Sequence, residues 1–220
     1  LENWRESADV ELVVRSIAQL GNYDYMVDWV FNQSGAIRVD IALTGIDAPK
    51  GVKSTTVAGA GAQEAKYGAL VAPNLVAPNH SHFFNFRLDL DVDGRNNSFV
   101  LGELKTQEGV PGPRKSVWFV DEKRVDRERD GRLDHDESAL WKVVNPNRTN
   151  ARGYNTGYVL ESHSSADPLL KKADFARAGF IEHALWVTRH DPDQRFAAGD
   201  TPNQNPGEPG LPAAPPRTRS

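Results

Sequence analysis

The histidine pair, His80 and His82, is the most evident metal-ligating feature of this sequence of 220 residues. Side chains at positions i and i+2 of an extended strand point to the same side, and their Cα atoms lie about 6.5–7 Å apart. Two imidazoles at that spacing can bind one metal ion, and among divalent first-row metals the affinity is greatest for copper. The spacing therefore predicts a metal site. The alternative is two ordinary histidines in a loop before a strand.

An aromatic stripe that includes Tyr23 is the second candidate. Apolar or aromatic side chains occupy every second position from Tyr23 to Phe31, whereas Asp24 and Asp28 lie between them. Core packing is the default explanation for such a stripe. A phenol next to Cu(II), however, can ionise and be oxidised by dioxygen at its ring carbons. Tyr23 is therefore of chemical interest only if the fold brings it to the histidine pair.

The acidic run from Asp89 to Gly94 is similar to the start of a calcium-binding loop. Position twelve of that loop would be Val100, where an EF-hand requires a bidentate glutamate, so an EF-hand is excluded. Asp89 and Asp91 nevertheless share one strand face, opposite the histidine pair, and can hold a hard cation with ligands from elsewhere. The alternative is a polar outer face that ends in an Asp-Gly turn at Asp93.

The elements that must position these residues are mostly antiparallel β-strands. Period-two alternation predicts strands at residues 12–20, 23–31 and 37–43, with turn residues before the last of them. A longer strand with one buried face is predicted over residues 80–93, so that the histidine pair starts its apolar side. Further strands are predicted at 68–72, 98–104, 117–120 and 181–188, a surface loop at 51–61 and a short helix within 168–179.

These strands predict an antiparallel two-sheet β-sandwich over residues 1–200. Residues 121–137 carry dense charges of both signs, which is typical of a solvated surface segment. Prolines are concentrated in residues 201–220, which indicates an extended segment without a packed element.

The composition excludes several functional classes. With 26 basic and 30 acidic side chains the net charge is −4, which disfavours a nucleic-acid binder because that function needs clustered Lys and Arg. No apolar run reaches the ~18 residues of a membrane-spanning helix. The chain has no cysteine, which excludes disulfides, thiolate metal sites and cysteine nucleophiles. The lack of cysteine and of a signal segment favours a cytoplasmic location.

Several motifs taken together resemble those of the copper-containing primary amine oxidases. The run Gly21-Asn22-Tyr23-Asp24-Tyr25 resembles that family's cofactor motif, although Gln19 stands where Ser or Thr is usual. Residues 76–84, which include the histidine pair, resemble the family's copper-ligand strand. The other matching stretches are residues 12–17, 87–94, 199–204 and 210–212. The resemblance covers nearly the whole chain.

This resemblance implies a copper and topaquinone centre. Tyr23 would be the precursor of topaquinone, which such proteins form themselves from copper and dioxygen, and Asn22 and Asp24 would flank this cofactor. His80 and His82 would be two of three copper ligands. The third histidine, the aspartate that removes the α-proton and a tyrosine that positions the quinone are expected outside these 220 residues.

The resemblance also implies a second metal ion, a reaction and an assembly. Asp89, the carbonyl of Leu90 and Asp91 would belong to a peripheral site for calcium or manganese. Enzymes of the family oxidise a primary amine with dioxygen and water to an aldehyde, ammonia and hydrogen peroxide, and they are homodimers. The fold would be the family's β-sandwich, incomplete at both ends. We therefore expect this chain alone to be inactive.

Two other functions fit parts of the sequence. A cupin-like mononuclear metal oxygenase also uses His-x-His on a β-strand; here Glu103 or His183 would complete its site, and iron or zinc would be bound without a quinone. A non-catalytic β-sandwich module with structural calcium at Asp89 and Asp91 is the other alternative. Neither accounts for the motif Asn22-Tyr23-Asp24-Tyr25.

Overall fold

The computed structural model describes residues 8–134, 139–162, 168–169, 176–193 and 195–198. Their regular elements are mostly β-strands, and the strand pairs that they form are antiparallel. The chain divides into two compact units, Leu1–His82 and Phe83–Ser220, called here the N-terminal and C-terminal units. The mostly β, antiparallel class predicted from the sequence is confirmed. The predicted proline-rich segment, 201–220, lies outside the described residues.

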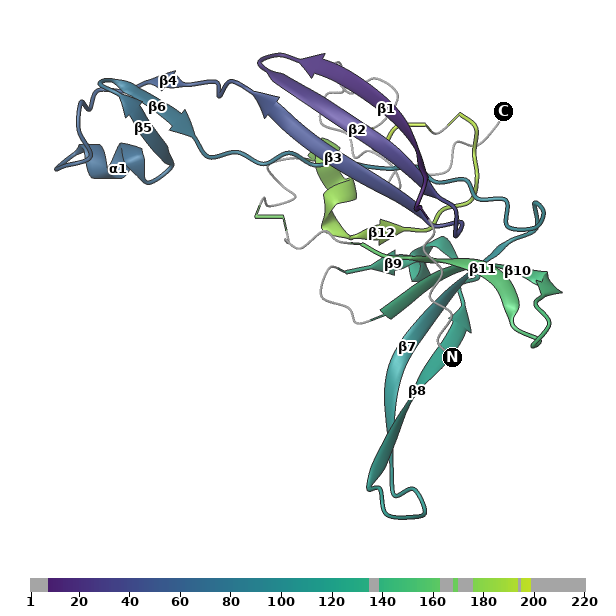
Figure 1. Ribbon diagram of the computed structural model, residues 1–220. Helices are drawn as coiled ribbons and strands as arrows, with labels where there is room; N and C mark the ends of the chain where they lie inside the picture. The colour runs from purple at the N-terminus through teal and green to yellow at the C-terminus, as the bar shows by residue number, and fades with distance from the viewer. Residues whose placement is uncertain (1–7, 135–138, 163–167, 170–175, 194, 199–220) are drawn as a thin grey trace, which may run out of the picture. The chain divides into compact units, whose positions relative to one another are not determined.

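The main sheet of the N-terminal unit contains β1 (Glu11–Leu20), β2 (Tyr23–Asn32) and β3 (Ile37–Gly45), with β2 in the centre. All three strands form where alternation predicted them, and they lie side by side in Figure 1. Gly21, with φ at 63°, lets the chain turn directly from β1 into β2, because glycine adopts this left-handed conformation without a Cβ clash. The tight turn places Tyr23 at the first position of β2.

A smaller sheet of the same unit contains β4 (Lys50–Gly51), β6 (Leu75–Pro78) and β5 (Gly68–Ala72), in that order. The helix α1 (Gly61–Ala65) follows the surface loop that the sequence predicted. The strand β6 is missing from the sequence-based prediction. The strand β6 ends at Pro78, two residues before His80, so this small sheet determines where the chain enters the histidine pair.

The C-terminal unit is organised around a four-stranded sheet in the order β11-β10-β7-β8. Within it, β7 and β8 form a long hairpin, and β9 pairs with β12 in a separate two-stranded sheet (Figure 1). Leu133, Trp141 and Ile181 are buried in this unit. The elements are β7 (Ser98–Glu108), β8 (Ser116–Arg124), η1 (Glu128–Asp130), β9 (Arg132–Leu133), β10 (Ala139–Thr149), β11 (Asn155–Leu160), η3 (Ala176–Glu182) and β12 (Leu185–Trp186).

The prediction of a long strand over residues 80–93 is wrong. Residues 79–91 pair with no strand of the described chain. Of the side chains predicted to form the buried face, Val92 is buried, whereas the histidine pair is exposed. A strand needs hydrogen-bonding partners on a neighbouring strand, and alternation along one segment does not provide them.

Two strands of the four-stranded sheet, β10 and β11, are also missing from the sequence-based prediction. Pro146 lies inside β10, and a proline ordinarily argues against a central strand because it cannot donate a ladder hydrogen bond. The pairing of β10 with β11 shifts register between Val144 and Thr149, which includes this proline. The irregularity therefore accommodates a residue that has no N–H to donate to the ladder.

The remaining predictions concern the second half of the chain. Residues 121–134 are mostly exposed, as expected for the charged segment, although β8 extends into them as far as Arg124. The strand predicted over 181–188 is reduced to β12. Of the helix predicted within 168–179, residues 170–175 lie outside the described residues, and η3 begins at Ala176. The described residues form no helix with the length and apolar character needed to span a membrane.

Candidate metal centre

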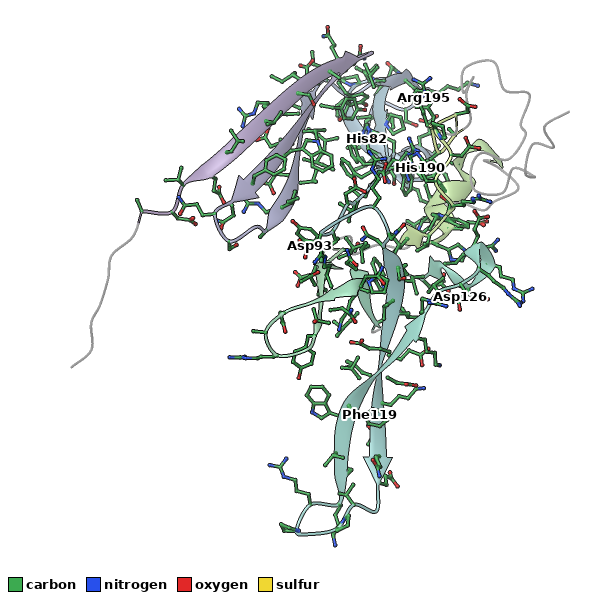
Figure 2. The ribbon with its side chains drawn as sticks, turned by 90° about the vertical axis from the view of Figure 1, so that its right-hand side faces the viewer. His82, Asp93, Phe119, Asp126, His190 and Arg195 are labelled. Carbon is green, nitrogen blue, oxygen red and sulfur yellow. The ribbon has the colours of Figure 1, made fainter. Side chains whose placement is uncertain are left out.

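The histidine pair meets two side chains of β2, Tyr23 and Tyr25, called here the tyrosine pair. The Tyr23 Oη atom lies 3.0 Å from His80 Nε2, and the Tyr25 Oη atom lies 2.8 Å from His82 Nδ1. The Tyr23 ring centroid lies 5.4 Å from that of His80 and 4.9 Å from that of His82. All four residues belong to the N-terminal unit, and His82 is labelled in Figure 2. The structure thus brings together the phenol and the imidazoles that the sequence singled out separately.

The tyrosine pair is placed by the start of β2. Tyr23 is its first residue, and Tyr25 follows on the same face because strand side chains alternate. Gly45 pairs with Tyr23 and permits a close backbone approach, since a Cβ there would lie 2.3 Å from the carbonyl oxygen of Asn22. That same oxygen accepts a hydrogen bond of 2.9 Å from the Ile46 N–H. The backbone before Tyr23 is therefore fixed by β3 and the residue that follows it.

The histidine pair is placed by the end of β6. The Asn79 N–H donates a hydrogen bond of 2.8 Å to the Tyr67 carbonyl, and His80 Nδ1 lies 2.9 Å from the Pro78 carbonyl oxygen. A carbonyl oxygen only accepts, so in the neutral imidazole Nδ1 of His80 carries the proton and Nε2 offers a lone pair. The Tyr23 hydroxyl then donates its hydrogen bond to His80 Nε2. This is the nitrogen with which His80 can bind a metal ion.

The two pairs differ in exposure. The tyrosine pair is half-buried, whereas the histidine pair is exposed. The sequence alternation predicted that both faces are buried, and this is wrong for the imidazoles because residues 79–91 do not lie within a sheet. The phenol side of the centre is therefore the more sheltered one.

The acidic side chains of β2 lie on the face opposite the tyrosine pair. Asp24 and Asp28 occupy the alternate positions of the strand, so the centre receives no carboxylate from them. Arg15 donates two hydrogen bonds of 2.7 Å to the Asp28 carboxylate, one from Nε and one from Nη2. These hydrogen bonds lower the pKa of Asp28 below its usual value, and the attraction of the guanidinium charge acts in the same direction. The predicted roles of Asn22 and Asp24 beside a cofactor stay predictions.

The second predicted metal site lies in the C-terminal unit. Asp89 and Asp91 are both exposed, and Asp89 Oδ2 lies 3.4 Å from His190 Nδ1. In the part of the chain that the structure describes, no group of three or more His, Asp and Glu side chains is arranged to hold a metal ion. The peripheral site made of Asp89, the Leu90 carbonyl and Asp91 is therefore still a prediction.

The second half of this acidic run is held by two asparagines. Asn97 accepts a hydrogen bond of 2.9 Å from the Val92 N–H and donates one of 3.1 Å to the Val92 carbonyl. The buried Asn145 donates hydrogen bonds to the carbonyl oxygens of Val92 at 2.8 Å and of Asp93 at 3.1 Å. Side-chain amides thus satisfy the backbone hydrogen-bonding groups here, as a neighbouring strand would in a sheet.

The extra ligands considered for an oxygenase have partners of their own. Glu103 lies 3.1 Å from Lys105 and 3.4 Å from Lys123, and hydrogen bonds from these ammonium groups lower the pKa of the Glu103 carboxyl. His183 Nδ1 contacts the carboxylate of Asp134. The contact of His183 with Asp134 is not predictable from the sequence, because no spacing pattern connects two residues 49 positions apart.

Tyr25 belongs to the centre, but the sequence alone predicts for it only a place in the aromatic stripe. Its contact with His82 repeats, two residues further along both segments, the contact of Tyr23 with His80. The signal was present as a shared i, i+2 spacing of phenols and imidazoles. It becomes visible only when the two segments are known to lie against each other.

Comparison with known proteins identifies the kind of β-protein that carries this centre. The sequence profile of the family described as "Copper amine oxidase, enzyme domain" matches residues 2–219. The chain is 41% identical to Primary amine oxidase 1 of Arabidopsis thaliana, over 93% of this chain and 32% of that protein. It is 37% identical to the primary amine oxidase of Klebsiella aerogenes, over 91% of this chain and 28% of that protein. The chain thus spans about a third of the length of these relatives.

A solved structure agrees with the sequence comparison. The copper-containing benzylamine oxidase from Hansenula polymorpha superposes with a TM-score of 0.79 at 25% sequence identity, over 91% of this chain and 31% of that one. The fold of the chain therefore matches part of an amine oxidase, as the resemblance implied. The chain belongs to the copper amine oxidase family, within its enzyme domain.

Proposed function

We propose that this chain provides the copper-binding and cofactor-precursor part of a primary amine oxidase. The observation that carries the proposal is the contact of 3.0 Å between the Tyr23 hydroxyl and His80 Nε2. It puts an oxidisable phenol at the imidazole nitrogen that can bind copper. Membership in the copper amine oxidase family supports the same roles for Tyr23 and the histidine pair.

The donor set of the centre suits copper. Imidazole nitrogens favour Cu(II) over the other divalent first-row metals, and His80 offers Nε2 because its Nδ1 is engaged by Pro78. A copper ion bound there would take the lone pair to which the Tyr23 hydroxyl donates its hydrogen bond, and it would lie beside the phenol. Topaquinone formed from Tyr23 would supply an electrophilic carbonyl for a primary amine. Asn22 and Asp24 would flank it in sequence.

The substrates that we propose are a primary amine and dioxygen, with an aldehyde, ammonia and hydrogen peroxide as products. The names of the relatives support this class, since they are described as primary amine oxidases and as a benzylamine oxidase. The described part of the chain contributes a phenol and two imidazoles to the reaction.

Titration with Cu(II) tests the metal part of the proposal. We expect the wild-type chain to bind copper, and His80→Ala and His82→Ala to bind it at least about tenfold more weakly, because each variant removes a direct imidazole ligand. His190→Ala is the matched control, since His190 belongs to the C-terminal unit and contacts Asp89 instead. Copper affinity that is unchanged in both ligand variants contradicts the proposal.

Exposure of the copper-loaded chain to dioxygen tests the precursor part. We expect a visible quinone absorption in the wild-type chain and none in Tyr23→Phe, which keeps the ring but lacks the hydroxyl. Tyr67→Phe is the control, because Tyr67 is an exposed tyrosine of the same unit. An absorption of equal size in Tyr23→Phe excludes Tyr23 as the precursor.

We also propose a hard-cation site at Asp89, the Leu90 carbonyl and Asp91. The hydrogen bonds from Asn97 and Asn145 to the next residues support it, because they hold the backbone in one conformation. Calcium should raise the Tm of the wild-type chain and should not raise that of Asp91→Asn. A wild-type Tm that calcium leaves unchanged rules this site out.

A homodimer is the assembly that we propose for the protein. Large apolar side chains are exposed on the β7–β8 hairpin, where Trp118 is 73% and Leu104 52% accessible, and Figure 2 shows Phe119 on the same hairpin. Exposed apolar side chains that gather on one element mark association surfaces. Light scattering should report a dimer for the wild-type protein and a weakened one for Trp118→Ser. A wild-type monomer argues against the assembly.

A further inference from the structure

We propose that Tyr25 is a positioning residue for the metal centre: its hydroxyl oxygen accepts a hydrogen bond from Nδ1–H of His82 and leaves His82 Nε2 as the metal-binding nitrogen. This inference rests on the proposed copper function and adds a residue to it. The geometry behind it is the separation of 2.8 Å between Tyr25 Oη and His82 Nδ1. It assigns to each tyrosine of the pair a different task.

The two imidazoles receive their Nδ1 partners from different parts of the chain. His80 has Nδ1 at 2.9 Å from the Pro78 carbonyl, so its protonation is set by the backbone, and its Nε2 faces the Tyr23 hydroxyl. His82 has Nδ1 at the Tyr25 hydroxyl. In each imidazole Nδ1 faces an oxygen atom, which is the Pro78 carbonyl oxygen for His80 and the Tyr25 hydroxyl oxygen for His82. Both rings are therefore arranged to bind a metal ion through Nε2.

Both partners of Nδ1 are oxygen atoms that can accept a hydrogen bond. A histidine that ligates a metal usually donates its other N–H to an oxygen, which fixes the tautomer and the ring orientation. A backbone carbonyl does this for His80, and the phenol oxygen of Tyr25 is the corresponding acceptor for His82. A phenol can also donate, so the direction of this hydrogen bond decides which nitrogen of His82 is available. The proposal commits to Tyr25 as acceptor.

Tyr25 is held in place by its position in the sheet. It lies in the central strand, paired with Ala18 of β1 on one side and with Leu43 of β3 on the other. Its ring centroid lies 5.6 Å from that of His82 and 6.4 Å from that of Tyr23. A half-buried ring in a doubly paired strand has little freedom to move, so its oxygen can hold an imidazole that is itself exposed.

Tyr25→Phe is the substitution that tests this role, because it keeps the ring packing and removes one oxygen. In the metal-free wild-type chain, long-range proton–nitrogen NMR spectra should show His82 protonated at Nδ1. In Tyr25→Phe this preference should be lost, while His80 keeps the Nδ1–H form set by Pro78. His80 therefore serves as the internal reference in the same spectrum. If Tyr25 contributed only to packing, Tyr25→Phe would lower the stability of the fold and would not change the protonated nitrogen of His82 alone.

Copper affinity, measured by competition with a chelator, gives the second readout. We expect Tyr25→Phe to bind Cu(II) about 10- to 100-fold more weakly, as is typical when the partner of a ligating histidine is removed. Tyr154→Phe, at an exposed tyrosine of the C-terminal unit, should bind it like the wild-type chain.

The outcomes separate this inference from the function on which it rests. A wild-type chain that binds no copper overturns the proposed function and the role of Tyr25 together. Copper bound equally well by the wild-type chain and Tyr25→Phe overturns the role of Tyr25 alone. A metal-free His82 protonated at Nε2 in the wild-type chain also overturns it alone, since Tyr25 would then be the donor.

Discussion

The strand β2 and the segment 79–91 both alternate apolar with polar residues, yet only β2 is a strand. Nearly every residue of β2 is paired on both sides, with β1 and with β3. The segment 79–91 pairs with no strand of the described chain, and side-chain amides hold the backbone just after it. Alternation therefore reports which way side chains face, whereas a strand also requires a neighbour that satisfies its backbone.

The candidate metal centre joins these two kinds of structure. The tyrosine pair comes from the doubly paired strand, and the histidine pair comes from the start of the unpaired segment. The phenol groups are thus held by a paired strand, and the imidazoles contact them at His80 Nε2 and His82 Nδ1.

Gly45→Ala should produce the largest effect on stability, because it disrupts the pairing of β3 with β2 at Tyr23. The added Cβ would lie 2.3 Å from the Asn22 carbonyl oxygen and 2.7 Å from Tyr23 Cα, and the φ of Gly45, at +134°, is one that other residues rarely adopt. We expect a loss of about 3 kcal/mol or more in the free energy of unfolding, measured with urea. Gly51→Ala is the control, since a Cβ there meets nothing within 4 Å. Equal stability of the two variants would contradict this account of the turn.

The sheet formed by β1, β2 and β3 is also the region that the sequence predicted best. Alternation along β1, β2 and β3 and the turn residues between them are local signals, and each strand lies next to its neighbour in the chain. The central strand β10 pairs with β11, its neighbour in the chain, but its other partner is β7, which is far away in sequence, and it contains Pro146. A pattern within one segment carries no information about such a partner, which explains why β10 was missed.

The candidate site was predicted in parts and not as a whole. The i, i+2 spacing identified the histidine pair, and the resemblance to amine oxidases connected it with Tyr23. The contact of Tyr25 with His82 spans 57 residues, and the tautomer of His80 depends on the Pro78 carbonyl. Both require coordinates, because a sequence does not show which nitrogen of an imidazole faces which oxygen.

Asn145→Ala should have the next largest effect, because it tests whether side-chain amides replace a strand partner for the acidic run. The substitution removes the donors to the Val92 and Asp93 carbonyls from a residue that is only 3% exposed. We expect a loss of about 1–3 kcal/mol in urea unfolding, since buried acceptors are left without their donor. Asn147→Ala, at an exposed neighbour, should change stability by less than about 0.5 kcal/mol. If both variants unfold at the same urea concentration, the amide of Asn145 does not hold this backbone.

Asp28→Asn should give the smallest effect, because its ion pair with Arg15 joins two strands that the sheet already holds. The hydrogen bonds from Arg15 lower the pKa of Asp28 in the folded chain, so the ionised carboxylate stabilises the fold above the pKa of the unfolded chain. This contribution is lost as the pH falls through the folded-state pKa. The difference in urea midpoint between the wild-type chain and Asp28→Asn should therefore be present at neutral pH and vanish in acid. Asp47→Asn, at an exposed residue beyond β3, is the control for removal of a charge. A difference for Asp28→Asn that stays constant into acid would mean that packing, and not the ion pair, accounts for it.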